Sequence, residues 1–349
     1  ILNTGSKITS TGEGGIQNIQ VVDPNMRALL QTTMGLLDPI HTPESEKIGI
    51  DLHLSIGARK DGKKLIMNVW NNKEKRFEEI DHTKAASSVI ALPGKNFKNG
   101  EFTTDQVRAS KNGKIQLVPV DEIDYVIPRP QALFDAAVNL VPFLNNNSGA
   151  RMFMAAKQMA QALPVTKHEP PLVQTTIGGK SLDELYGGGY VLRSDVDGEV
   201  EKIEDYKIHI RGADGKLHTI PFPKNFPLNH GHLIDTELLI KPGDKIKKGQ
   251  LIGDSIFTKG GKLAIGQNMR VAYMSDGGYN FEDGITVSES AAKKLESIHL
   301  EKIAMQADPN VFIFKDKFKA QFPGMLKEDT EKKLDEKGII REREIVKPG

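Results

Sequence analysis

Short strand-forming segments between glycines and prolines are the feature that most limits what this chain can fold into. Its 349 residues include 33 glycines and 18 prolines. Residues 171–265 are densest in both, with short β-branched segments such as GEVEKI and YKIHIRG between them. Glycine and proline end regular elements and favour turns. We therefore predict a mixed α+β fold, mainly β, in which small β-barrel or sandwich segments are combined with helices.

Other regions carry their own secondary-structure signals. Within 61–130, KLIMNVWNN and GKIQLVPV predict strands between the turn signals DGK, KNG and NGK. The next segment is helical in pattern but is interrupted by Pro142 and NNNSG, so we expect a helix near 148–163. A further helix is predicted over 325–337 and should end at Gly338.

The charge balance gives no sign of a free-standing nucleic-acid binder. Lys and Arg number 47 against 46 Asp and Glu, a net charge of +1, whereas such binders usually have a basic excess.

Zero cysteines exclude a disulfide framework and a Cys-ligated zinc site. The lack of cysteine suits a reducing cytoplasm, where we expect the protein. No apolar run approaches the roughly 20 residues that span a bilayer, so we expect no membrane partner. Because the first residue is not Met, we expect a processed chain or a portion of a longer one.

Three separated blocks carry a resemblance to a known family. The first starts with GEGG and continues with DPIHTPESEKIGIDLHLSIGAR, the second reads NLVPFLNNNSGARMFMAAKQMAQALP, and the third reads GQNMRVAYMSDGGYNFEDGITVSES. In this order they resemble parts of the β (second-largest) subunit of multisubunit DNA-dependent RNA polymerases. The end of the chain, KKLDEKGIIREREIVKPG, is similar to the start of that family's flap, or wall, region.

The resemblance implies four regions along the chain. They are a fork-loop and NTP/RNA-side region (1–170), a Gly/Pro-rich barrel or sandwich-like region (171–265), the first part of a double-psi β-barrel with a YNFED loop (266–300), and the start of the flap (301–349). The barrel should be incomplete, and another segment or chain should complete it. The segment MRVAYM and the sequence after the YNFED loop are expected to be strands.

The resemblance also implies a part in nucleotidyl transfer. In this reaction two divalent metals stabilise the attacking and leaving oxygens. The family's metal-chelating aspartates belong to the β′ subunit, so Mg²⁺ is expected mainly on that partner, and no direct metal ligand is assigned here. The chain itself should position NTP and nascent RNA.

Arg151 and Gln161 are the candidates for this positioning. Arg151 follows NNNSG just inside the predicted helix, where a guanidinium can bind phosphate oxygens with two N–H groups. The alternative is a solvated arginine at a helix start. By resemblance, Gln161 approaches the nascent RNA, although an ordinary exposed glutamine also fits.

Glu282 and Asp283 are the acidic candidates. Adjacent carboxylates in a tight loop repel each other unless a cation or hydrogen-bond donors lie close, which suits a supporting role beside Mg-NTP. The alternative is an acidic surface turn. Tyr279 and Phe281 alternate with Asn280 and are expected to pack into the core beneath the loop.

Polar residues at the start of the third block have two open interpretations. Gln267, Asn268 and Arg270 either bond to backbone and fix the barrel loop, or contact RNA.

The first block is assigned to the fork and template region. By resemblance, Gly12, Gly14 and Gly15 belong to the fork loop. Glu44 lies in a rigid Pro-rich turn, which we interpret as scaffolding near the fork, with template contact as the alternative.

The chain also departs from the family pattern. His41 stands where the bacterial family usually has Glu, and we interpret it as a hydrogen-bonding loop residue. The Lys-bearing motifs that the family places later are absent, so the expected partners are a further β segment that carries them, the β′ subunit, template DNA, nascent RNA and NTPs. This arrangement resembles the split β subunits of large bacteriophages, in an infected host cell or packaged in a virion.

One other function remains open, and a third is disfavoured. The chain could be a non-catalytic structural or interaction fragment that retains the β fold. DGEVEKI and IKPGDKIKKGQLI also resemble a biotinyl-like carrier domain, but such a domain needs a Lys at a hairpin tip in a Met-Lys-type context, and none is found.

Overall fold

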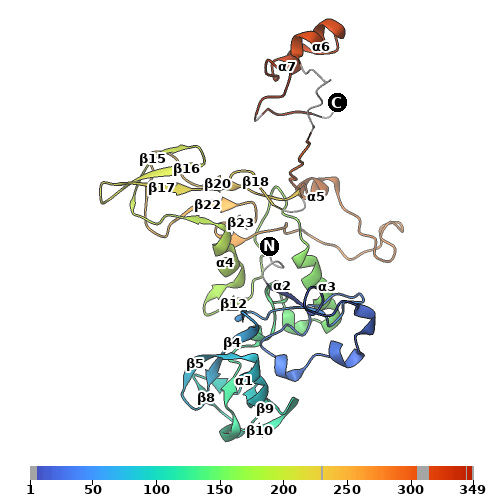
Figure 1. Cartoon of the computed structure of the whole chain (residues 1–349), viewed down its shortest axis with the longest axis vertical. Helices are drawn as coiled ribbons and strands as arrows, with labels where there is room; N and C mark the ends of the chain where they lie inside the picture. The colour runs from blue at the N-terminus through green and yellow to red at the C-terminus, as the bar shows by residue number, and fades with distance from the viewer. Residues whose placement is uncertain (1–5, 229–230, 305–313, 343, 348–349) are drawn as a thin grey trace. The chain divides into compact units, whose positions relative to one another are not determined.

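The computed structural model describes residues 6–228, 231–304, 314–342 and 344–347. The chain divides into two compact units, Ile1–His299 and Leu300–Gly349 (Figure 1). The larger unit is strand-rich, with several small antiparallel sheets and short helices, which confirms the predicted mixed and mainly β composition. Every helix among the described residues is too short or too polar to cross a bilayer.

A seven-stranded sheet forms the first large body of strands. Its strands are β3 (Ala58–Asp61), β4 (Lys64–Asn71), β5 (Arg76–Asp81), β6 (Ile90–Ala91), β9 (Gln106–Lys111), β10 (Lys114–Pro119) and β11 (Tyr125–Val126). Strand β4 pairs with β3, β5 and β11, and α1 (His82–Ser87) follows β5. Met67 and Val69 of β4 are buried in one cluster with Ile80, because alternate side chains of a strand share a face. The strands predicted from KLIMNVWNN and GKIQLVPV are confirmed.

A two-residue turn fixes the register of the β9–β10 hairpin. Asn112 and Gly113 have φ angles of 53° and 71°. A type I′ turn requires this left-handed conformation at both central positions. Lys111 is consequently paired with Lys114, and the turn predicted from KNG is confirmed.

Helix α2 (Ala136–Leu140) begins at a buried cap. Asp135 accepts a hydrogen bond from the backbone N–H of Val138 through its Oδ1 at 2.8 Å. This satisfies one of the N–H groups that a helix start leaves unpaired. Ile40, from the Pro-rich turn, packs on the cluster that includes α2. The Pro-rich turn and the start of α2 therefore belong to one packed region.

Helix α3 (Gly149–Ala160) packs on α2 through one face. Met152 and Ala156 are buried beside Ala137, because residues four apart lie on the same side of a helix. The opposite face, which includes Met154, is exposed. The helix predicted near 148–163 is confirmed and is slightly shorter than predicted, from Gly149 to Ala160.

Two small sheets share a second core. Their strands are β14 (Leu192–Arg193), β15 (Gly198–Glu204), β16 (Lys207–Gly212), β17 (Leu217–Pro221), β20 (Thr236–Leu238), β21 (Lys245–Ile246) and β22 (Leu251–Ser255). One sheet has the order β14-β22-β20 and the other β17-β16-β15-β21. Ile208, Ile210 and Ile252 are fully buried between them. No barrel is detected among the described residues. For 171–265, the predicted short strands are therefore confirmed, and they pack around a shared core.

Several short elements complete the fold. The remaining paired strands are β1 (Lys7–Thr9) with β2 (Asp51–His53), β7 (Phe97–Lys98) with β8 (Glu101–Phe102), β12 (Thr176–Ile177) with β13 (Lys180–Ser181), β18 (Phe226–Pro227) with β19 (Leu233–Ile234), and β23 (Thr258–Lys259) with β24 (Lys262–Leu263). The other helices of the larger unit are α4 (Leu182–Gly187) and α5 (Glu289–Lys294). Single 3-10 turns lie at Ile19–Val21, Pro24–Arg27, Gln31–Thr33, Val120–Glu122, Pro130–Leu133, Leu144–Asn146 and Gly188–Tyr190.

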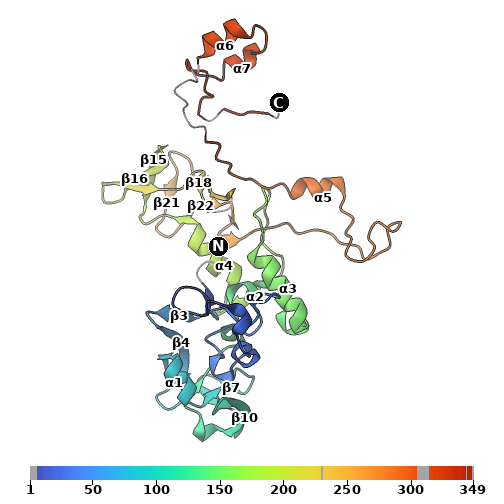
Figure 2. The same cartoon turned by 45° about the vertical axis from the view of Figure 1, so that its right-hand side comes forward.

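The strands predicted within 266–300 are not present. MRVAYM and the segment after the YNFED loop run as loop up to α5 (Figure 2). A β-branched alternating pattern favours a strand, but a strand also needs a neighbouring backbone to pair with. The described part of the chain gives MRVAYM no such neighbour. Tyr279 and Phe281 are 83 % and 76 % exposed, so the prediction that they pack into the core is wrong.

The helix predicted over 325–337 is replaced by the four-residue α7 (Glu328–Glu331). A second short helix of the smaller unit, α6 (Lys315–Gln321), precedes this range. Beyond α7, Asp335 Oδ1 accepts hydrogen bonds from two following backbone N–H groups at 2.9 and 2.8 Å. Such local bonds offer the backbone an alternative to a helix. Gly338, with φ of 84°, lies in this turn instead of ending a long helix.

Candidate functional site

The chain after α3 brings two of the sequence blocks together. The backbone N–H of Thr166 donates to the carbonyl of Glu296 at 2.7 Å, and that of Glu169 donates to the carbonyl of Gly266 at 2.8 Å. Residues 267–295, most of which are exposed, are named the surface loop, and both of its ends are thus held by one short segment. That segment directly continues α3. The second and third sequence blocks therefore share one support.

Arg151 is the third residue of α3 and is exposed. Its guanidinium Nη1 lies 3.7 Å from the sulfur of Met154, a weak acceptor. Among the described residues no carboxylate pairs with it. A positive charge in the first turn also opposes the helix dipole, whose N-terminal end is itself positive. The guanidinium is therefore open to an anion from outside this part of the chain.

Gln161 occupies the C-terminal cap position of α3 and is exposed. It lies ten residues beyond Arg151, or about 15 Å along a helix axis at the usual rise per residue. The two side chains are on one helix but cannot contact the same phosphate group.

Asn268 has the contacts of a loop-fixing residue. Its backbone N–H and its side-chain Nδ2 donate to Glu169 Oε2 at 3.3 and 3.1 Å, and Nδ2 also donates to the Pro170 carbonyl at 3.0 Å. The neighbouring Gln267 has its Oε1 buried without a hydrogen-bond partner in the described structure. Arg270 is exposed. The geometry of Asn268 favours the first interpretation given above for this group.

Glu282 and Asp283 lie in a tight turn of the surface loop. Asn280 organises this turn, since its Oδ1 accepts from the Asp276 N–H at 3.0 Å and its Nδ2 donates to the Met274 carbonyl at 2.5 Å. Glu282 has φ of 54°, and both carboxylates are exposed. No third potential metal ligand gathers with them within the described ranges.

The glycine loop of the first block is a compact exposed turn after β1. The N–H of Ile16 donates to the carbonyl of Ser10 at 2.9 Å. A Cβ on Gly15 would lie 2.5 Å from that same carbonyl oxygen, so this position requires glycine. Gly12 and Gly14 both have positive φ. Glu44 is exposed in the Pro-rich turn and has no special geometry that would assign it to template.

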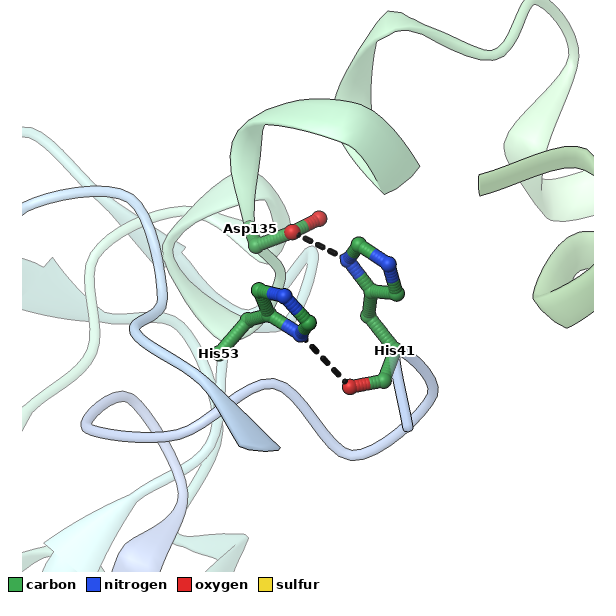
Figure 3. A group of neighbouring side chains, drawn as sticks. All are labelled: His41, His53 and Asp135. Carbon is green, nitrogen blue, oxygen red and sulfur yellow. Dashed lines mark hydrogen bonds and ion pairs between the residues drawn. The ribbon is translucent and has the colours of Figure 1, made fainter. Parts of the chain in front are cut away.

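A buried polar cluster lies inside the larger unit (Figure 3). His41 Nδ1 is 2.5 Å from Asp135 Oδ2. The His41 and His53 rings are stacked with centroids 3.7 Å apart, and His53 Nδ1 donates to the His41 carbonyl at 3.0 Å. Asp38 accepts backbone hydrogen bonds from Ile40, His41 and Asp135. All four residues of the cluster are at most 5 % exposed.

Burial shapes the protonation of this cluster. It raises the pKa of Asp38 to about 6, and the nearby Asp135 carboxylate adds to the rise. Burial also lowers the pKa of His53, because a charged imidazole loses its hydration there. His41, expected to be a hydrogen-bonding loop residue, is instead part of a buried cluster, and no sequence motif pointed to His53 or Asp135.

Comparison with known proteins agrees with the order of the sequence blocks. Residues 2–59 match the family described as RNA polymerase Rpb2, domain 3, and residues 196–349 match RNA polymerase Rpb2, domain 6. The DNA-directed RNA polymerase subunit beta of Thermus aquaticus is 29 % identical over 350 residues, covering 98 % of this chain and 31 % of that protein. The corresponding subunit of Mycoplasmopsis pulmonis is 32 % identical over 357 residues, covering 97 % of this chain and 28 % of that protein.

The chain thus spans less than a third of the length of these curated relatives. The matches nevertheless run from one end of the sequence to the other, and they include all three blocks singled out above. The chain is therefore homologous to a portion of the β subunit of DNA-directed RNA polymerase, one that includes its domains 3 and 6.

Proposed function

We propose that this chain is a working portion of an RNA polymerase β subunit and positions NTP and nascent RNA beside the active centre of the β′ subunit. The supporting observation is the segment after α3, whose backbone bonds hold both ends of the surface loop. This arrangement carries the arginine of one sequence block and the paired carboxylates of another on a common support. A shared support lets groups from distant parts of the sequence act on one substrate.

Arg151 is assigned to the triphosphate of the incoming NTP. Charge builds on phosphoryl oxygens during nucleotidyl transfer, and fixed positive groups stabilise it. The guanidinium is exposed, has no carboxylate partner in the described chain and lies at a helix end that itself favours anions. Gln161, farther along α3, is assigned to the nascent RNA.

Glu282 and Asp283 are assigned a supporting role near Mg²⁺. Their oxygens are of the type that Mg²⁺ prefers, but within the described ranges they do not form a cluster of three ligands. The residues therefore fit an ion held chiefly by the β′ subunit, which would neutralise charge on the phosphates. Their own part is to bias the local potential or to orient basic groups of a partner.

The partners follow from the exposed surface loop. We assign its uncovered apolar side chains to a β segment that would complete the double-psi barrel and carry the lysine motifs. Template DNA, the β′ subunit and the RNA product complete the assembly, with Gly12, Gly14, Gly15 and Glu44 near the fork, and Gln267 and Arg270 beside the loop support. A split subunit of bacteriophage type, acting in the cytoplasm of a bacterium or infected host, remains our proposed origin.

The test is Arg151→Ala in the assembled enzyme. Loss of a charge-assisted phosphate contact should cost about 1.5–3 kcal/mol of transition-state stabilisation. This lowers kcat/KM for NTP roughly 10- to 150-fold. Template binding should hardly change. Arg108→Ala is the matched control, because Arg108 is also exposed but lies on β9 in the large sheet.

Either of two results would contradict the assignment. Unchanged NTP kinetics would favour the alternative of a structural or interaction fragment. An equal loss of template binding would show that Arg151 holds nucleic acid in place of NTP.

A further inference from the structure

A cavity of about 510 Å³ opens in the larger unit, and we name it the sheet–helix pocket. Its walls come from strands β4 and β5 of the seven-stranded sheet, the segment around the Pro130–Leu133 turn, strand β12 and helix α4. We propose that this pocket binds a segment of a partner protein, which inserts an apolar side chain and places a carboxylate on Arg129.

The inner part of the pocket suits an apolar side chain. Ile56 and Ile177 pack on the cluster that contains Leu182, which is 1 % exposed. At the rim, Phe77 is 55 % and Leu185 is 48 % exposed. An apolar side chain that is buried here would contribute about 1.5–3 kcal/mol to binding. The exposed rim leaves an open mouth, which suits a protein segment, because small-molecule sites enclose most of their ligand.

Arg129 gives the pocket its charge preference. Among the described residues that line the pocket, it carries the only charge. Its guanidinium Nη1 reaches the turn between β12 and β13, where a Cβ on Gly178 would lie 3.9 Å away. Within the described chain no carboxylate pairs with this guanidinium.

An unpaired arginine beside apolar side chains favours an acidic protein segment. A guanidinium binds a carboxylate with two parallel N–H groups, which fixes orientation as well as charge. A nucleic-acid strand would instead need several cations along its phosphates, and the lining offers one. The observed chemistry therefore points to an Asp or Glu next to an apolar residue in the partner.

Three uncharged polar side chains can bond to the backbone of such a segment. They belong to Asn68, Gln131 and Tyr186. A carboxamide both donates and accepts, as a peptide unit requires when it leaves water. Burial raises the pKa of Tyr186 to about 12, so its hydroxyl keeps its proton at neutral pH and can donate.

The experiment places a photoreactive residue at the rim of the pocket. In the full chain within its native complex, p-benzoylphenylalanine replaces Leu185, and mass spectrometry identifies the peptides that crosslink on irradiation. We expect a peptide of another protein with an apolar residue within about three positions of an Asp or Glu, roughly 10 Å of extended chain. The same replacement at Leu117 is the control, because Leu117 is 66 % exposed on β10 and does not line the pocket.

A charge reversal then tests the role of Arg129. Arg129→Glu should lower the yield of this crosslink at least about tenfold over a dilution series, because like charges meet in the interface. Reversal of the partner's carboxylate to Lys should restore the yield in Arg129→Glu. Arg108→Glu, at an exposed arginine of β9, should leave the yield unchanged.

Several results would overturn the proposal. They are a crosslink no stronger than that of the Leu117 control, a crosslinked peptide without an acidic residue, a peptide from a second copy of this chain, a bound small molecule in place of a peptide, and an unchanged yield in Arg129→Glu. Neither Arg151 nor the surface loop lines the pocket. Such a result would therefore leave the function proposed above standing.

Discussion

The neighbouring carboxylates of Glu282 and Asp283 offer the most direct residue-level test of the site. Both are exposed in a turn that Asn280 holds in shape. The double substitution Glu282→Gln, Asp283→Asn keeps their size and hydrogen-bonding capacity, so it removes charge alone. If the pair supports Mg-NTP, the variant should need more Mg²⁺ and add nucleotides more slowly. The measurement is a Mg²⁺ titration of single-nucleotide extension on a preformed RNA–DNA scaffold.

Two outcomes would count against this role. Curves with the same midpoint and plateau as wild type would make the pair a surface turn. Failure of the variant complex to assemble would make it structural. Glu289→Gln, on α5 of the same loop, is the control, because Glu289 already pairs with Lys293 at 2.9 Å.

Asp183 is a buried titratable group away from the proposed site. Burial raises its pKa from 3.8 to about 6, and Lys262 offsets part of this rise. The folded chain therefore binds this proton more tightly than the unfolded chain does. Between about pH 4 and 6 the unfolded chain ionises first, so the free energy of unfolding falls as pH rises.

The substitution Asp183→Asn should remove this pH dependence. After a discount for solvent screening, we expect the variant to be more stable than wild type by about 1–2 kcal/mol at neutral pH and equally stable near pH 4. Urea unfolding of the full chain, followed by circular dichroism, measures the difference. Asp195→Asn, at an exposed position, should show no such pattern. A constant difference at both pH values would contradict the burial argument.

Residue contacts that join distant parts of the chain were beyond sequence reasoning. Arg151 and the carboxylate pair could be singled out, because their motifs are continuous in the sequence. His53 and Asp135 could not, since they meet His41 across 12 and 94 residues. No periodicity or spacing in the sequence links these positions. The apolar pattern also misplaced Tyr279 and Phe281, because alternation alone does not say whether a loop has a core beneath it.

At the scale of elements, α3 depends on its buried face. Met152 is 2 % exposed and packs on α2, whereas Met154 on the same helix is 40 % exposed. Met152→Ala should cost about 2–5 kcal/mol through lost burial and a cavity. Met154→Ala should cost far less. Amide hydrogen exchange of α2 and α3 measures the loss of protection, and equal effects of the two substitutions would contradict this account of the packing.

Elements were predictable where local chemistry decides them. The hairpin at Asn112–Gly113 and helix α3 could be predicted, because turn geometry and helix periodicity depend on residues that are neighbours in the sequence. The strand expected at MRVAYM failed for a different reason, since strand formation needs a second backbone. The long helix over 325–337 failed because Asp335 bonds to its own following backbone. Propensity does not register either effect.

At the scale of the whole molecule, the surface loop exposes several large apolar side chains. Val271, Tyr273 and Ile285 are 73 %, 100 % and 84 % exposed. Apolar surface of this kind usually marks an interface, and an extended unpaired backbone adds the risk of edge-to-edge association. Without its proposed partner segment, the chain should therefore self-associate or remain poorly soluble when expressed alone.

The triple substitution Val271→Ser, Tyr273→Ser, Ile285→Ser tests whether this loop is the cause. It removes apolar side chains that make few contacts in the folded chain, so it should reduce association without lowering the free energy of unfolding. Light scattering coupled to size-exclusion chromatography compares the variant with wild type at several concentrations. Leu172→Ser is the control, because Leu172 is 86 % exposed but lies outside the loop.

Co-expression with the β segment that carries the lysine motifs should solubilise the wild type. The same segment should bind the triple variant more weakly. A wild-type chain that is monodisperse alone, or a triple variant that associates as strongly as wild type, would remove the loop as the binding surface for that partner.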